Sequence, residues 1–258
     1  MPEPTSTPFT APTNPNYGQG VFRRRVRLSG QAGKVVAELE DCCHGFRSVV
    51  YHDGQQVTDI QAEALRIPLT TCTGAVEPIK ALIGTDLNSS TLDIHRQVSI
   101  NANCTHIYDL TLLAIAHCRR GNTERIYDVA VEDEAGTTSE ATVHLNQQLI
   151  HKWQTKDFAV LEPQAIAGKP MMKGFTLWAN DTFDGDDREA AFVLQKGYFV
   201  AQARIYDMDK LDGVAAVNNE TMLGVCYSYS ADVVGNAFRT SKTTRDFTDT
   251  PEQLLRFL

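Results

Sequence analysis

Apolar residues recur at short intervals in the first third of the chain, and this pattern limits the possible folds more than any other feature. The runs are Val26/Leu28, Val35/Ala37/Leu39, Phe46 with Val49 and Val50, and Val57/Ile60. Alternation with a period near two predicts β-strands with one buried face. Turn-forming residues separate the runs, at Ser29–Gly33 and His52–Gly54. The segment from Val21 to Leu69 therefore predicts an antiparallel β-meander.

Beyond Pro68 the pattern changes from strand to helix. Residues Val76 to Ile83 predict a short helix that ends at Gly84, and a polar connector follows from Thr85 to Ser90. A stronger helix is expected from Cys104 to about Cys118, with Asn103 as its N-cap. Its apolar stripe is formed by Ile107, Leu110, Ala114 and Cys118.

The second half repeats this order of elements. Four strands are expected at Ile126–Glu132, Ser139–Leu145, Leu149–Gln154 and Phe158–Leu161, and helices at Met171–Thr182 and Asp187–Ala203. The tetrad Arg-Ile-Tyr-Asp follows the second helix of each half, at 125–128 and at 204–207. A final strand-like stretch runs from Met222 to Phe238. The chain is therefore predicted to be an α+β protein built from a duplicated meander–helix unit.

These patterns divide the chain into three parts. Residues 1–20 are rich in proline, threonine and asparagine, which predicts a flexible leader. Residues 21–120 form the first unit. Residues 121–258 form a second unit that makes one pseudo-symmetric domain with the first.

Composition excludes several classes of partner. The chain of 258 residues has a net charge of −8, and no run approaches the ~20 apolar residues of a membrane helix. We expect no nucleic-acid partner and no membrane partner, but a small-molecule substrate. The N-terminus lacks the pattern of a secretory signal, so we expect a cytoplasmic protein whose six cysteines are not disulfide-bonded.

One basic run interrupts this acidic chain. Arg23, Arg24, Arg25 and Arg27 lie within the first alternating stretch. They fit the solvent-facing side of a strand or, alternatively, a clamp for a phosphate or coenzyme.

The residues with catalytic chemistry gather in the first unit. Cys104 is expected at a helix N-terminus, where backbone N–H groups favour a thiolate and lower its pKa. His106 follows two residues later, and Asp109 is placed to orient its imidazole. His44 opens a strand and Cys72 lies in a turn. Such element ends can bring side chains together on one site.

Two chemistries remain open for these residues. In the first, Cys104, His106 and Asp109 act as nucleophile, base and orienting carboxylate. In the second, the four residues His44, Cys72, Cys104 and His106 supply the two imidazoles and two thiolates of a tetrahedral metal site, for which zinc or iron would be the metal. Alternatively each of these residues is structural, as buried cysteines usually are.

Four stretches of the first unit resemble bacterial domain-of-unknown-function family 2889. They are Val35–Asp41 with His44, Pro68–Ala75, Leu82–Gly84 and Cys104–Leu110. This resemblance covers about residues 21–120 and implies no settled activity. The order of meander, turn cysteine and helices is also distantly similar to the iron–sulfur scaffold fold of NifU-type and SufE-like units. That likeness implies that His44, Cys72 and Cys104 or His106 meet in one small metal site.

Three functions are therefore expected to compete. The first is a hydrolase that acts on a small acyl compound, such as an acyl thioester or a β-keto acyl substrate, through the Cys/His/Asp set or a bound metal. The second is a metal or iron–sulfur binding and delivery protein without catalytic turnover. The third is an interaction module without chemistry.

Overall fold

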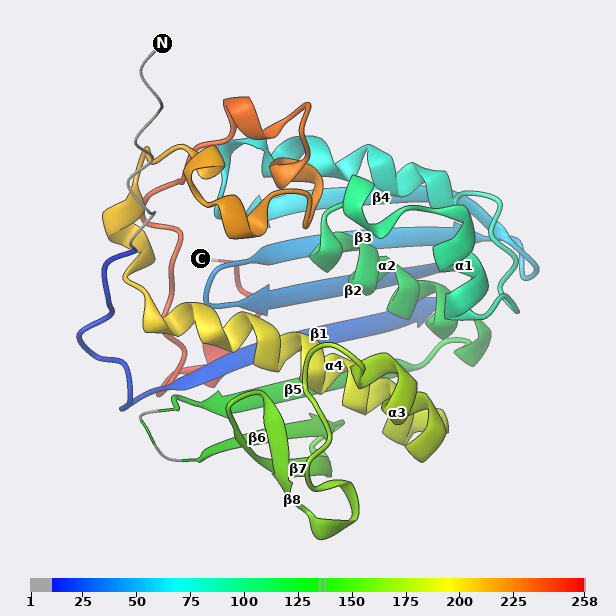
Figure 1. The fold of residues 1–258 in the computed structure, drawn as a ribbon. Coiled ribbons are helices and arrows are strands. Elements are labelled where there is room, and N and C mark those ends of the chain that lie inside the picture. Colours follow the sequence, from blue (N-terminus) through cyan, green and yellow to red (C-terminus); the bar gives the residue numbers. More distant parts are fainter. Residues whose placement is uncertain (1–10, 135, 137, 258) are drawn as a thin grey trace.

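Eight strands form one continuous antiparallel sheet in the computed structural model, which describes residues 11–257 except 135 and 137 (Figure 1). The strands of the first half are β1 (Val21–Gln31), β2 (Lys34–Asp41), β3 (Gly45–His52) and β4 (Val57–Arg66). Those of the second half are β5 (Glu124–Glu132), β6 (Ser139–Leu145), β7 (Gln148–Lys156) and β8 (Ala159–Glu162). Both predicted meanders are therefore present, and the expected α+β class is confirmed.

The strand order is β4-β3-β2-β1-β5-β6-β7-β8, so each half extends outward from the centre in sequence order. The two halves join where β1 pairs with β5, from Val21 opposite Glu132 to Ser29 opposite Glu124. Alternate residues of β1 face opposite sides of the sheet. Phe22, Val26 and Leu28 are buried on one side, whereas Arg25 and Arg27 on the other bond to Asp128 and Glu38.

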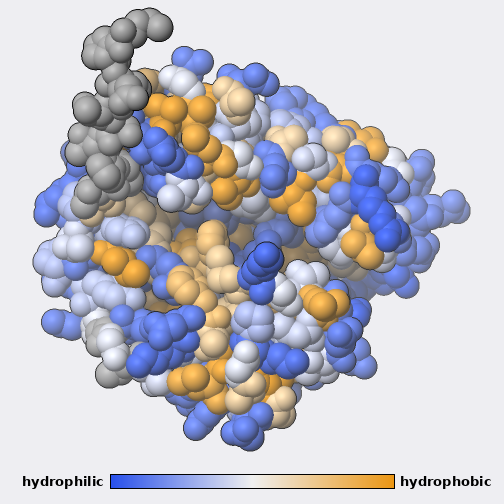
Figure 2. All heavy atoms as spheres, in the orientation of Figure 1, coloured by the Kyte–Doolittle hydropathy of each residue, from blue (hydrophilic) through white to orange (hydrophobic). Residues whose placement is uncertain are grey.

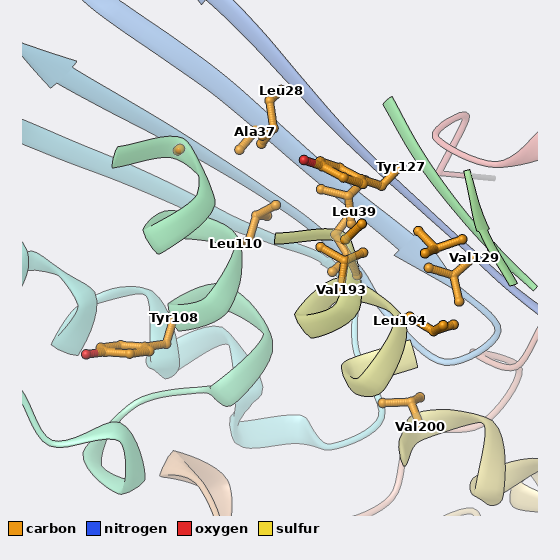
Figure 3. Close-up of a cluster of buried hydrophobic side chains, with 14 of the residues drawn as sticks. Leu28, Ala37, Leu39, Tyr108, Leu110, Tyr127, Val129, Val193, Leu194 and Val200 are labelled. Carbon is orange, nitrogen blue, oxygen red and sulfur yellow. The ribbon is translucent and has the colours of Figure 1, made fainter. Parts of the chain in front are cut away.

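The longest helices cover the apolar face of the sheet. Helix α2 (Thr105–His117) packs on β2 and β3, and α4 (Gly185–Ala201) packs on β5 and β6. Figure 3 shows Leu110 of α2 and Val193 of α4 directed toward the strands, beside Leu39 and Tyr127. Gly197 allows α4 to approach β5 closely, because a Cβ there would lie 2.7 Å from a methyl group of Val129. The central core is thus one layer between the sheet and these two helices.

Two shorter helices complete the helical layer. Helix α1 (Thr91–Gln97) lies on the outer side of α2, where His95 contacts Tyr108 at a ring separation of 5.6 Å. Helix α3 (Phe175–Thr182) packs against α4. Helix α1 was not expected, because its seven residues are mostly polar.

Several sequence expectations about the helices and the tail were wrong. The helix expected at Val76–Ile83 is two 3₁₀ segments, Thr70–Val76 and Pro78–Leu82. The strand expected at Met222–Phe238 is a series of turns with short 3₁₀ segments, which pack with Leu69 and Cys72 of the first half. The two Arg-Ile-Tyr-Asp tetrads occupy different elements, the first in β5 and the second in a 3₁₀ turn and extended backbone.

The expected leader, residues 1–20, is only partly described, since residues 1–10 lie outside the described part of the chain. Residues 11–20 are held to the body, unlike the flexible segment that their composition suggested. Asn14 donates from its backbone and side chain to Ile205 and Arg204, and the amides of Gly18 and Gly20 bond to Asp133. Polar contacts with a buried ion pair, Arg204–Asp133, replace the apolar contacts that this segment lacks.

Replacing Leu110 by alanine should lower the free energy of unfolding by about 2–5 kcal/mol, because it leaves a cavity between α2 and the sheet. Leu177 of α3 provides the control, since it is 71% exposed, and its change to alanine should cost less than about 0.5 kcal/mol. Chemical denaturation of both variants measures the difference. Equal losses would contradict the assigned core.

Candidate functional site

The turn between β2 and β3 is built around the carboxylate of Asp41. Its Oδ1 accepts hydrogen bonds from the backbone N–H groups of Cys43 and His44, both at 2.9 Å, and the Asp41 N–H donates to the His44 carbonyl. Aspartate favours such turns because its short side chain reaches the backbone amides that follow it. The turn fixes the direction in which the His44 side chain leaves the backbone.

Two side chains complete the surroundings of Asp41. Arg24 of β1 donates from Nε and Nη2 to Oδ2, at 3.0 and 2.6 Å, and Nδ1 of His44 lies 3.0 Å from Oδ1. Burial alone would raise the pKa of the Asp41 carboxyl, but His44 and Arg24 outweigh it and hold the pKa well below its usual value. Asp41 is fully buried and ionised, and it holds the His44 ring in place.

His106, in the first turn of α2, meets this pair from the other side. Its ring is stacked on that of His44, with ring centres 3.9 Å apart and an angle of 26° between the planes. Phe46 of β3 flanks both rings. Ligating atoms of Asp41, His44 and His106 all lie within 4.8 Å of one another, and no other such group of three was found among the described residues.

The environment of His106 favours its neutral form. Burial lowers the pKa of its imidazole well below the usual value, and the charges of His44 and Arg24 lower it further, against the opposing effect of Asp41. A charge on the stacked ring of His44 would therefore repel a charge on His106. We define Asp41, His44 and His106 as the histidine centre.

The histidine centre lies at the side of α2 that faces α4. Lys196 of α4 forms an ion pair with Asp109 of α2 at 3.0 Å, and its charge also acts on His106. Figure 2 shows the molecule hollowed across the middle of this face. In the orientation shared with Figure 1, the hollow lies between α4 and the part formed by α2 and the C-terminal turns.

Cys104 differs from its predicted state. It is the N-cap residue of α2, in place of the expected Asn103. The N–H groups of Ile107 and His106 do favour its thiolate, but burial is the larger effect and raises the pKa of the thiol far above its usual value. The expected lowering was wrong, because the helix end is covered and water is excluded from the sulfur.

Cys72 belongs to a separate cluster. It is buried beside Tyr229 and Val234 of the C-terminal turns, and Ser228 Oγ donates to its sulfur at 3.4 Å. Burial raises the pKa of this thiol as well. Of the four proposed ligands, His44 and His106 come together, while neither Cys72 nor Cys104 joins their group. All six cysteines are free of disulfides.

Asp109 does not orient His106, because its carboxylate is paired with Lys196 instead. Sequence reasoning missed Asp41 and Arg24 as site residues. The sequence did contain a signal for Asp41. This residue precedes His44 by three positions, and at that spacing a turn brings the two side chains together. Arg24 was grouped with a solvent-facing arginine run, yet it is only 3% exposed and is paired with Asp41.

The fold and the histidine centre define an α+β protein in which a buried carboxylate orients one of two stacked imidazoles. Residues 25–118 match the model of a protein family described as a protein of unknown function, DUF2889. The match confirms the family resemblance and contains all three residues of the histidine centre. No curated protein matches the chain. The likeness to NifU-type scaffolds stays a prediction.

Among the described residues, no helix is long and apolar enough to cross a membrane.

Replacing Asp41 by asparagine should lower the free energy of unfolding by about 3–5 kcal/mol, because Arg24 would keep a buried charge without a partner. Asp109→Asn is the matched control. It removes only the partly exposed pair with Lys196, so about 0–1 kcal/mol is expected. Denaturant unfolding of the two variants at neutral pH compares them. A larger loss for Asp109→Asn would show that the roles assigned to the two carboxylates are reversed.

Proposed function

We propose that the protein is a hydrolase of a small acyl compound and that the histidine centre activates the attacking water. The observation that carries this proposal is the convergence of Asp41, His44 and His106. A carboxylate bonded to Nδ1 of one imidazole leaves its Nε2 as the base, and it stabilises the cation that forms when a proton is taken.

Water is the nucleophile in the proposed reaction. An imidazole of the histidine centre removes a proton from water while the water oxygen bonds to the acyl carbon. The bond from that carbon to the leaving sulfur or carbon then breaks, and the imidazolium returns the proton to the leaving group. An acyl thioester or a β-keto acyl compound suits this sequence, because each has a leaving group that accepts a proton.

Water is favoured over a cysteine nucleophile. Burial raises the pKa of Cys104, and the thiol therefore stays protonated near neutral pH. In addition, the carboxylate that was expected to complete its triad bonds to Lys196. His44 is better placed to act as the base, because the Asp41 carboxylate bonded to its Nδ1 compensates the charge of a gained proton. Burial keeps His106 neutral, so its ring can accept a hydrogen bond from the attacking water.

The activity is tested with a panel of acyl and β-keto acyl thioesters. His44→Ala should lower kcat/KM by about 10²–10⁴-fold, the usual contribution of a general base. Cys104→Ser should keep activity within a few-fold of the wild type, and His52→Ala, at the end of β3, is the control. Loss of turnover in Cys104→Ser together with an active His44→Ala would overturn the proposal in favour of a cysteine nucleophile.

A divalent metal is a second candidate for the same centre, favoured by the mutual distances of its ligating atoms. Two imidazoles and one carboxylate fit zinc or iron and leave a position for water. When bound, such an ion would lower the pKa of its water to about 7. His44 and His106 would be two of the ligands, and Asp41 would have to give up one of its present hydrogen bonds to serve as the third. The same ligand set would serve a metal-delivery protein without turnover.

Elemental analysis of protein purified without chelator tests the metal. We expect about one equivalent of zinc or iron per chain, which His106→Ala should largely remove and Cys72→Ser should leave in place. Metal-free protein with full turnover would contradict the metal and leave the imidazole pair as the base. Metal-loaded protein without turnover on the whole panel would instead support metal delivery.

A further inference from the structure

Two adjacent thiols, those of Cys42 and Cys43, lie in the turn between β2 and β3 and take no part in the proposed reaction. Their sulfur atoms are 3.4 Å apart, and the two residues are only 3% and 9% exposed. Both are free cysteines. Because the sulfurs lie so close together, one ion can contact both of them without a movement of the backbone.

The backbone of the turn holds the two thiols in place. The Cys43 N–H donates to Asp41 Oδ1 at 2.9 Å, and the Cys42 carbonyl accepts from Arg66 Nη1 and from the N–H of Arg245. Adjacent Cα atoms are about 3.8 Å apart across a trans peptide, whereas ordinary disulfides need about 4.4–6.8 Å. A disulfide within the pair would therefore be strained, and the two thiols stay available as ligands.

A cavity of about 10 Å³ adjoins Cys43. This is the space of about one water-sized sphere, so the cavity suits a single ion. Met208, from the 3₁₀ segment Met208–Leu211, lines the same cavity, together with Arg239 and three threonines. The lining residues other than Cys43 are half-buried, so the cavity lies close to the protein surface.

The donors gathered here are two thiols and a thioether. Thiolate and thioether sulfur together suit Cu(I), whereas zinc takes thiolate, imidazole and carboxylate ligands. Binding of Cu(I) forms two S–Cu bonds and releases both thiol protons to solvent, while the copper keeps its oxidation state. The complex of one Cu(I) with two thiolates carries one negative charge.

The charges around the thiols suit such a complex. Arg239 lines the cavity, and none of the described residues in the lining is acidic. The positive charge of Arg204 also favours the thiolate of Cys42. The neighbouring carboxylate of Asp41 opposes it, but that charge is offset by the ion pair with Arg24. Cationic side chains can therefore compensate the negative charge of the copper complex.

We propose that Cys42, Cys43 and Met208 bind one Cu(I) ion, and we define these three residues as the dithiol site. The site is independent of the proposed hydrolase, because none of its ligands belongs to the histidine centre. It lies beside that centre, since the same turn carries both thiols and His44.

Anaerobic titration with Cu(I), in competition with the chromophoric chelator bicinchoninate, tests the proposal. The reduced protein should take up about one equivalent of Cu(I) per chain. Cys42→Ala and Cys43→Ala should each weaken binding by about 10²-fold or more, because each removes one of the two thiolates. Cys118→Ala removes a buried free cysteine at the end of α2 and should leave the affinity unchanged. No uptake by the wild type, or full uptake by both turn variants, would overturn the proposal.

A methionine variant tests the third ligand without altering the turn. Met208→Leu keeps the size of the side chain but removes its sulfur, and it should weaken Cu(I) binding by about tenfold or more. Met172→Leu makes the same change at a residue that is 37% exposed and outside the cavity. Equal affinities of these two variants would contradict the assignment of Met208. His106→Ala should retain the Cu(I) affinity, so this result is separable from the fate of the histidine centre.

Discussion

The buried ion pair between Arg24 and Asp41 is the interaction on which the site depends. It links β1 to the end of β2, and Asp41 also accepts two turn amides and the ring of His44. A buried carboxylate is costly unless charge and hydrogen bonds compensate it. Here the compensation comes from five donors on three residues, Arg24 of β1 and Cys43 and His44 of the turn between β2 and β3. His44 is held in its position because it supplies hydrogen bonds that the buried Asp41 carboxylate requires. The His44 ring therefore has a fixed direction before any ligand binds.

The second half of the chain closes the surroundings of that site. Because β1 pairs with β5, the sheet continues past the first meander, and α4 comes to lie beside α2. Lys196 of α4 then pairs with Asp109 and contributes to the field at His106. The C-terminal segment adds a further layer, since it bonds to Glu40 and Cys42 next to the site turn. The two halves thus share one hydrophobic core, whereas the residues of the histidine centre all belong to the first half.

The sequence predicted the strands well and the site only in part. Alternation of buried and exposed residues marks a strand locally, so both meanders could be located without tertiary information. The tail could not be assigned in this way, because Val225, Tyr227 and Tyr229 also alternate, yet the segment forms turns that pack on Cys72 and Leu69. Likewise, His44 and His106 could be chosen from their element ends. The partners of Asp109 and Arg24 depend on which helix and strand lie opposite, and spacing along the chain does not contain that information.

Burial has different consequences for the histidines and the cysteines of the first half. Removal of water disfavours the charged form of every group. For Cys104 and Cys72 the disfavoured form is the thiolate, which is the only reactive one, so burial makes these residues inert. For His106 the disfavoured form is the imidazolium, so burial keeps the ring neutral, with a free lone pair on one nitrogen. One physical effect therefore acts in opposite directions on the two residue types, and the buried carboxylate of Asp41 gives the neighbouring imidazole a stabilised site for the proton that it gains.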